Sequence, residues 1–305
     1  MNYIIGTGII ALLAKHILPG NWTIIPTFKS RFYSLNPPLD DGLLVKDPRL
    51  DDYYSQFCNS SIPIFIKRGL SYYGQIVDFT DEVIEVWLDK IYGDNHPRHA
   101  RIYWKTHMNL STYDIDAGRL YNILLNKYRN DIEIGSKIGK ITSISDHYFM
   151  CGDKRYDFEK LVSTIPFDGL SNILEANNKP HISYKNAQII NLQTDTLDFE
   201  GRSQLLVADH NIPFYKVDKL LNGSYIFYFN GEVPNPALSL MSTIKKFNII
   251  NGTMVPNYIT MGGPIESNAF KNLGVYLVGG YPLCDSMIDI NCSLLKLLDT
   301  ERWFK

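Results

Sequence analysis

The sequence has few cysteines and no excess of charge of either sign. Its four cysteines include no CxxC pair, so we predict no zinc site and assign no metal; they are Cys58, Cys151, Cys284 and Cys292. Scattered cysteines are typical of a reducing compartment, so we expect a cytoplasmic protein. The net charge is -2 at pH 7. Without a basic excess, nucleic acid is not an expected partner.

Long apolar runs are also missing. No stretch reaches the roughly 18 apolar residues that a membrane helix needs, so no membrane partner is expected. The first residues, MNYIIGTGIIALLAKHIL, resemble a signal peptide in hydrophobicity. They have no basic start and no small-residue cleavage site, and they contain two glycines. We therefore interpret them as a buried strand and helix.

A strand-helix-strand unit is predicted at the start of the chain. Residues 2–6 (NYIIG) have the short apolar pattern of a buried parallel strand. Residues 9–18 suit a buried helix, and residues 22–25 (WTII) suit a second strand. With 305 residues, of which 45% are hydrophobic, the chain can form one large or two medium domains.

Two glycines, Gly6 and Gly8, stand where the first strand turns into the helix. In that context Gly6 permits a tight turn, Gly8 lets the backbone approach a pyrophosphate, and Ala11 is small enough for helix-strand packing. The N-terminus of the helix offers free N–H groups to the phosphates. The pattern predicts a dinucleotide site, and the alternative is a plain glycine turn in an α/β domain.

One feature of a dinucleotide site is missing from the sequence. The second strand of such a fold usually ends in Asp or Glu, which holds the ribose hydroxyls. Here Pro26 and Thr27 follow the strand, and the nearest polar candidates are Thr27, Lys29 and Arg31.

Further along the chain, the pattern changes several times. We predict a long surface segment at 33–63, an amphipathic helix at 81–93 and a second helix at 118–130. Several strands are expected from IEIGSKIGKI (132–141) onward, and the strands between 182 and 230 suggest a second sheet. The end of the chain predicts a strand (GVYLVGG), a glycine turn and a closing helix.

Taken in order, three segments resemble the superfamily of flavin-dependent amine oxidases and UDP-galactopyranose mutase. They are the glycine turn, KLVSTIPFDGL (160–170) and GVYLVGGYPL (274–283). The resemblance implies an α/β fold, in which a Rossmann-type FAD-binding domain carries an inserted mixed α+β substrate domain of antiparallel strands and helices.

The same resemblance divides the chain into two domains. The discontinuous FAD-binding domain would comprise residues 1–35, 111–180 and 265–305. The substrate domain would comprise residues 36–110 and 181–264.

By position, the resemblance also implies FAD-binding residues, which are Gly6, Gly8, Ile9, Ile138, Ile141, Thr164, Pro166, Gly279, Gly280, Met287, Ile288 and Asp289. The first three would line the pyrophosphate, and one of the next two would contact the adenine side. Thr164 and Pro166 would mark the crossover between domains. The two late glycines would approach the ribityl chain, and the last three residues the isoalloxazine. The superfamily often has a charged residue where this chain has Gly280.

The function implied is that of an FAD-dependent oxidoreductase, an amine oxidase-like enzyme that oxidises an amine or a related small substrate by hydride transfer to flavin. Tyr215, Tyr228 and Arg202 are the candidate substrate contacts, and no catalytic residue is assigned. Two alternatives stay open. One is a non-redox flavin-dependent sugar-nucleotide mutase, and the other is a degenerate flavoprotein fold that acts as a binding or scaffolding protein.

Overall fold

The structure is a computed structural model. It describes residues 1–26, 63–65, 68–93, 111–113, 117–177, 179–180, 184–198, 200–220, 223–260, 265, 268–278 and 297–298. Most of the surface segment predicted at 33–63 lies outside these residues, as does most of the closing helix predicted near the end of the chain.

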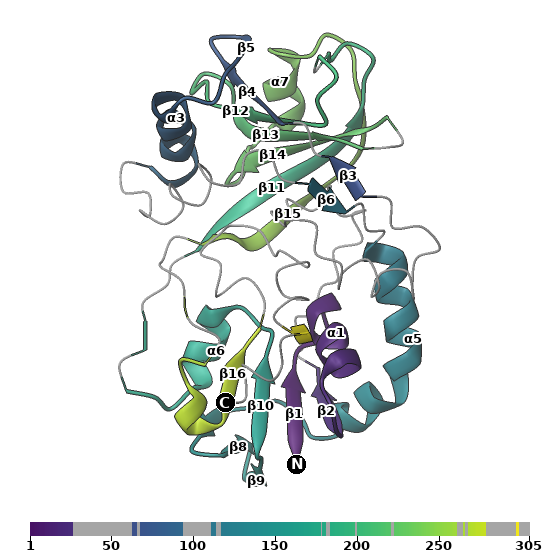
Figure 1. Cartoon of the computed structure of the whole chain (residues 1–305), viewed down its shortest axis with the longest axis vertical. Helices are drawn as coiled ribbons and strands as arrows, with labels where there is room; N and C mark the ends of the chain where they lie inside the picture. Colours follow the sequence, from purple (N-terminus) through teal and green to yellow (C-terminus); the bar gives the residue numbers. More distant parts are fainter. Residues whose placement is uncertain are drawn as a thin grey trace.

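Four parallel strands form the first sheet. They are β1 (Asn2–Ile5), β2 (Trp22–Ile25), β10 (Lys160–Ser163) and β16 (Val275–Leu277), in the order β16-β10-β1-β2. Helix α1 (Ile9–Ile17) joins β1 to β2, so the predicted strand-helix-strand unit is confirmed. The strands of this sheet point toward the other half of the molecule (Figure 1).

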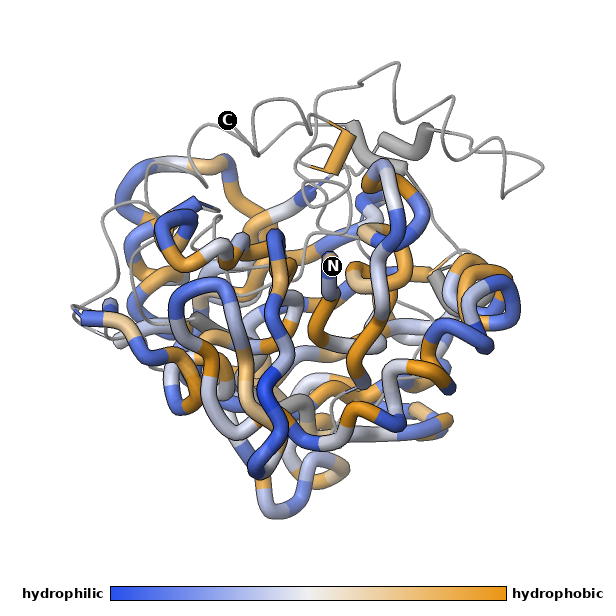
Figure 2. The backbone as a smooth tube through the Cα atoms, turned by 90° about the horizontal axis from the view of Figure 1, so that it is seen from below, coloured by the Kyte–Doolittle hydropathy of each residue, from blue (hydrophilic) through white to orange (hydrophobic). Residues whose placement is uncertain are grey.

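The parallel sheet is the middle of three layers. Its strands are apolar on both faces, and other elements bury each face. On one face Ile4 packs with helix α1 and helix α5 (Ala117–Ser136). On the other face, Tyr3 and Ile5 pack against helix α6 (Phe167–Ile173) and a three-stranded meander. The meander consists of β7 (Ser143–Ser145), β8 (Tyr148–Cys151) and β9 (Lys154–Asp157). Seen from the end that carries the N-terminus, hydrophobic segments run through the middle of the molecule (Figure 2).

Helix α5 continues further than the sequence pattern predicts. It ends at Ser136, so the strand expected from IEIGSKIGKI is wrong. The side chains that pack against the core around α1 recur at helical spacing, and they are Tyr121, Leu125, Tyr128 and Ile132. The alternation of Ile132, Glu133 and Ile134 therefore belongs to a helix of which only one face is covered.

Seven strands form the second sheet, in the order β15-β11-β14-β13-β12-β4-β5. They are β4 (Arg68–Tyr72), β5 (Gln75–Val77), β11 (Tyr184–Gln193), β12 (Gln204–Val207), β13 (Phe214–Lys219), β14 (Tyr225–Asn230) and β15 (Asn248–Thr260). The second sheet predicted between 182 and 230 is confirmed. Its strands pair antiparallel, as expected, except that β4 lies parallel to β12.

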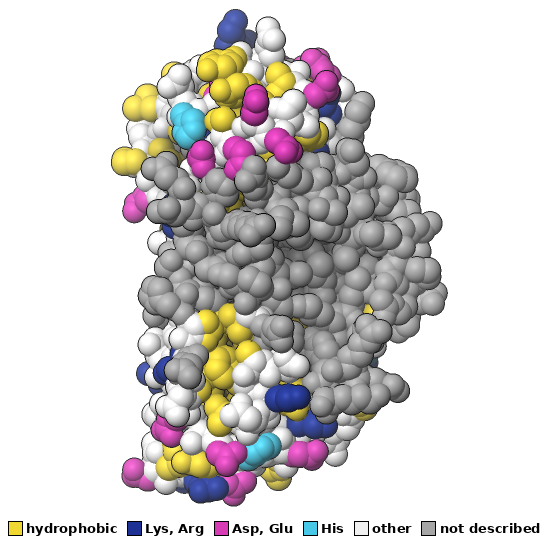
Figure 3. Space-filling model, turned by 60° about the vertical axis from the view of Figure 1, so that its left-hand side comes forward, with side chains coloured by type: hydrophobic (Ala, Val, Ile, Leu, Met, Phe, Trp, Pro, Cys, Tyr) yellow, Lys and Arg dark blue, Asp and Glu magenta, His cyan; other side chains and the backbone are white. Residues whose placement is uncertain are grey.

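Helices α3 (Asp81–Tyr92) and α7 (Pro236–Met241) cover opposite faces of the second sheet. Ile84 and Trp87 of α3 pack on one face, and Leu240 of α7 packs on the other. The hydroxyl of Thr80 caps α3 by accepting the N–H of Val83 at 3.4 Å. Acidic side chains gather on the upper part of the molecule, on the side where α3 lies (Figures 1 and 3).

Three smaller elements complete the described structure. Strand β3 (Pro63–Phe65) pairs with β6 (Ser111–Tyr113), and a short 3-10 helix, η1 (Lys271–Leu273), precedes β16. Among the helices that the structure describes, none is both long enough and apolar enough to cross a membrane. The domain boundaries given above stay a prediction.

Lys90 fastens the C-terminal half of α3 to the second sheet. Its ammonium donates hydrogen bonds to the carbonyl oxygens of Val207 (3.0 Å), Asp209 (2.6 Å) and Phe214 (2.7 Å). Burial lowers the pKa of Lys90 to about 7, and the nearby charge of Asp209 acts in the opposite direction. Because folding changes the pKa of Lys90, the free energy of unfolding depends on pH.

We expect the protein to become more stable as the pH rises above 7, because of Lys90. Its pKa is about 7 in the folded chain and 10.5 when unperturbed. Between these values the unfolded chain binds more protons, so the free energy of unfolding rises with pH, by at most about 1.4 kcal/mol per pH unit. Below pH 7 both states are protonated, and the cost of burying the ammonium is fully present.

Urea unfolding of the wild type and of Lys90→Met, measured from pH 6.5 to 9.5, checks this expectation. The wild type should gain stability relative to the variant across that range. Other groups that titrate there, including Lys185 with its lowered pKa, are present in both proteins and cancel in the comparison. Parallel pH profiles would show that Lys90 keeps its proton in the folded state.

Candidate functional site

The turn between β1 and α1 lies at the edge of the parallel sheet that faces the rest of the molecule (Figure 1). Gly6 has a φ of +118°, a conformation that residues with a side chain rarely adopt. Its N–H donates to the carbonyl oxygen of Ile25 on β2 at 2.9 Å. The turn is therefore tied to the second strand of the unit.

Thr164 ties the same turn to β10 on the other side. Its N–H and its hydroxyl both donate to the carbonyl oxygen of Ile5, at 3.0 Å and 2.9 Å. A Cβ placed on Gly6 would lie 2.3 Å from the Oγ1 atom of Thr164, far inside van der Waals contact. Glycine is therefore required at position 6 for two separate reasons, its φ angle and its neighbour.

Gly8 occupies the N-cap of α1 and faces open space. It is exposed, its φ of -69° suits any residue, and a Cβ there would meet no atom of the described residues within 4 Å. No side chain in the part of the chain that the structure describes caps this helix, and its first turn has no acidic residue. Its free N–H groups and partial positive charge are therefore left for an anion.

The end of β2 has no acidic residue. Ile25 pairs with Ile5 in register, so Pro26 follows at the level of the glycine turn. The next acidic residue along the sequence is Asp40. Thr27, Lys29 and Arg31, the polar candidates for the ribose contact, lie outside the described residues. An adenosine ribose at this edge would therefore lack the usual carboxylate among the described residues.

Ile138 and Ile141 follow α5 in a turn and an irregular segment, and not in the strand that was expected. The side chain of Ile141 is buried and that of Ile138 half-buried, and both pack in the core between the sheet and the meander. An adenine contact from either would have to come from its backbone, as predicted; that contact stays a prediction.

The remaining predicted cofactor residues fall into two groups. Ile9 is the first residue of α1, and Pro166 is the N-cap of α6, so both stand just after the ends of parallel strands, as Thr164 does. Five others lie outside the described residues, and they are Gly279, Gly280, Met287, Ile288 and Asp289. The described chain reaches Val278, whose N–H donates to Ser163 O at 2.9 Å.

Tyr215 and Tyr228 lie inside the core between the second sheet and α3. Their exposed fractions are 1% and 0%. The ammonium of Lys216 lies 3.9 Å from the centre of the Tyr228 ring, and it pairs with Asp218 at 3.4 Å. Both rings pack in this core, and their predicted contact with a substrate stays a prediction.

Arg202 is held by its own neighbours. Its guanidinium forms an ion pair with Glu200 at 2.8 Å. Its side chain covers Gly69, where a Cβ would lie 2.4 Å from the Cδ atom of Arg202. Its role in substrate binding stays a prediction, and the ion pair would compete with any substrate anion.

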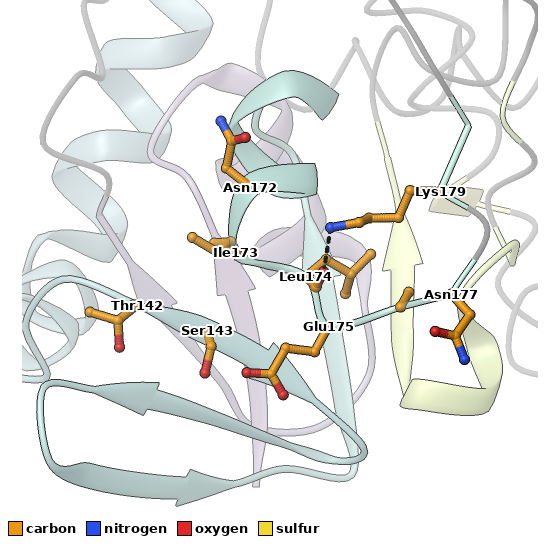
Figure 4. Close-up of a pocket in the computed structure, with 9 residues that line it drawn as sticks. Thr142, Ser143, Asn172, Ile173, Leu174, Glu175, Asn177 and Lys179 are labelled. Carbon is orange, nitrogen blue, oxygen red and sulfur yellow. Dashed lines mark hydrogen bonds between the residues drawn. The ribbon is translucent and has the colours of Figure 1, made fainter.

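A separate polar groove of about 510 Å³ lies near the end of α6 (Figure 4). It is lined by Thr142, Ser143, residues 172–177 and Lys179. The Lys179 ammonium donates to Ser171 O at 2.6 Å and to Leu174 O at 2.9 Å, which satisfies carbonyl groups at the C-terminus of α6. Lys179, the cation in this groove, thus has a structural role. Gly6 and Gly8 do not line the groove.

Sequence reasoning missed the contact between Thr164 and Gly6. Both residues were selected for the cofactor site, but for different roles. The signal that could have found the contact is the parallel pairing of the strands NYII and KLVS, which brings the residue after each strand to the same edge of the sheet.

Comparison with known proteins identifies the fold. No protein-family model matches the sequence, and no curated protein does. Reduced UDP-galactopyranose mutase matches with a TM-score of 0.61 at 11% identity, over 98% of this chain and 94% of that one. The chain has the fold of the flavoenzymes. Cyclohexylamine oxidase from Brevibacterium oxydans IH-35A matches with a TM-score of 0.58 at 8% identity, over 99% of both chains.

Glycine oxidase from Bacillus cereus ATCC 14579 also matches, with a TM-score of 0.55 at 11% identity, over 99% of this chain and 93% of that one. A mutase and an amine oxidase are the two kinds of enzyme that the sequence resembles. The Rossmann-type fold with an inserted second domain is therefore confirmed. At these identities the likeness concerns the fold of this chain and not its activity or substrate.

Proposed function

We propose that this protein binds FAD and oxidises an amine or a related small substrate by hydride transfer to the flavin. The observation that carries the proposal is the N-terminus of α1, which no described side chain caps and which, among the described residues, opens to free space at Gly8 directly after the Gly6 turn. In a Rossmann-type fold this is the place for a pyrophosphate.

The chain's own residues would hold the cofactor mainly through its phosphates. The backbone N–H groups at Gly8 and Ile9 would donate to the pyrophosphate, because no side chain among the described residues competes for them. Bound flavin supplies the hydride acceptor, and the protein supplies position and shelter from water. Because the end of β2 lacks an acid, we expect the ribose to add less affinity than in a typical dinucleotide site.

The visible absorbance spectrum of the purified protein tests this proposal. We expect the two bands of oxidised flavin, either as purified or after FAD is added and the excess removed. A colourless protein that quenches no added FAD fluorescence would overturn the proposal and favour the degenerate, cofactor-free alternative. A panel of amines, assayed by peroxide release, then tests the substrate class.

The mutase alternative rests on one observation, the match to reduced UDP-galactopyranose mutase. In such an enzyme bound reduced flavin would supply the nucleophile, and the substrate would undergo no net oxidation. Turnover of a sugar nucleotide only after reduction of the flavin, without peroxide release from amines, would favour this alternative over the oxidase.

A further inference from the structure

Thr164 stands out because its hydroxyl occupies the space beside Gly6. We propose that Thr164 is a positioning residue that holds the Gly6–Gly8 turn in the shape that receives the cofactor's phosphates. The role toward FAD rests on the proposed function above. The role toward the turn rests on the hydrogen bonds and the close approach alone.

The peptide that joins Ile5 to Gly6 is fixed on both sides. Its carbonyl oxygen accepts two hydrogen bonds from Thr164, one from the N–H (3.0 Å) and one from the hydroxyl (2.9 Å). Its N–H donates to Ile25 O at 2.9 Å. Three hydrogen bonds therefore fix the plane of the peptide at which the turn begins.

The hydroxyl of Thr164 adds a side-chain contact with the turn that the backbone pairing of the sheet does not supply. The bond from its N–H continues the parallel ladder between β1 and β10. The bond from its Oγ1 atom brings the side chain over Gly6, into the space where a Cβ would be. Because a β-branched side chain has few rotamers, this contact limits the movement of the turn. A turn that is ordered before binding costs less entropy when the ligand arrives.

Matched substitutions separate the hydroxyl from the shape of the side chain. Thr164→Val keeps the volume and loses the hydroxyl, and Thr164→Ser keeps the hydroxyl. Thr142→Val is the control, because the N–H and hydroxyl of Thr142 also both donate to one carbonyl oxygen, that of Met150 (2.8 Å and 3.2 Å). Thr142 lies next to the meander, away from the Gly6–Gly8 turn, and its side chain is not one of the predicted cofactor contacts.

The first measurement is FAD affinity by fluorescence titration of the full-length apoprotein. We expect the dissociation constant to rise roughly five- to tenfold in Thr164→Val, which corresponds to the loss of one hydrogen bond. Thr164→Ser should stay within about threefold of the wild type, and Thr142→Val should bind as the wild type does. Equal affinity of Thr164→Val and the wild type would overturn the role toward FAD.

The second measurement needs no cofactor. Amide hydrogen exchange of the apoprotein should be faster at residues 6–9 in Thr164→Val than in the wild type, with no such change in Thr142→Val. If the wild type takes up no FAD, the proposed function fails, and faster exchange still supports the positioning role. Unchanged exchange at residues 6–9 in Thr164→Val would overturn that role, whatever the cofactor result.

Discussion

Gly8→Asp is expected to weaken FAD binding at least about 100-fold while it leaves the apoprotein as stable as the wild type or slightly more stable. The two effects have opposite signs because they depend on the same free N–H groups. A Cβ at position 8 meets no described atom within 4 Å, and the φ of -69° suits Asp, so the substitution causes no strain against the described structure. Asp is a favoured N-cap residue, and it should gain a few tenths of a kcal/mol over Gly.

The loss of affinity follows from charge. The Asp carboxylate would accept hydrogen bonds from the N–H groups that we propose bind the pyrophosphate. It would also place a negative charge beside the pyrophosphate. Two like charges about 4 Å apart near a protein surface repel by about 4 kcal/mol. We therefore expect the FAD dissociation constant to rise at least about 100-fold, since each 1.4 kcal/mol is a factor of ten. Fluorescence titration and urea unfolding measure the two effects.

Gly8→Ser is the matched variant, because Ser caps a helix equally well without a charge. It should weaken FAD binding less than Gly8→Asp, and it should show a similar small gain in stability. If Gly8→Asp bound FAD as tightly as the wild type, the pyrophosphate would not lie at α1, and the cofactor site would have to be sought elsewhere in the chain.

The parts of this fold that the sequence predicted are those with strong local signals. The strands NYII and WTII are apolar on both faces, and between them a glycine turn precedes a helix without proline. This order of patterns predicts a strand-helix-strand unit. The end of α5 was missed because Ile132 and Ile134 alternate like a strand, while only the packing of Ile132 beside Tyr128 reveals the helix.

The candidate site was predicted less completely than the fold. The role of Gly8 follows from its place before a helix, which is a local property. The contact between Thr164 and Gly6 joins residues far apart in the sequence, and only the pairing of β1 with β10 creates it. Tyr215 and Tyr228 belong to strands, as predicted, but alternation cannot say which layer covers a face. Helix α3 covers the sheet face that carries these two tyrosines, so both rings are buried.

Gly135→Ala is expected to destabilise the fold by about 3 kcal/mol or more, which makes it the most damaging change that we predict for stability. Gly135 is buried near the end of α5, where the helix runs alongside β2 (Figure 1). A Cβ there would lie 1.7 Å from the carbonyl oxygen of Ile24 and 2.7 Å from its carbonyl carbon. Both are backbone atoms of a strand, so they cannot rotate away as a side chain can.

The helix would have to move away from β2 and give up the packing of Tyr128 and Ile132 against the core. Gly169→Ala in α6 is the matched control, because the nearest atom to its Cβ would be Ile165 Cδ1 at 3.9 Å, an ordinary contact. That change should be neutral or stabilise by about 0.4–1 kcal/mol, since Ala loses less chain entropy than Gly. Urea unfolding of the two variants compares them. Equal stability of Gly135→Ala and the wild type would mean that α5 and β2 do not approach each other so closely.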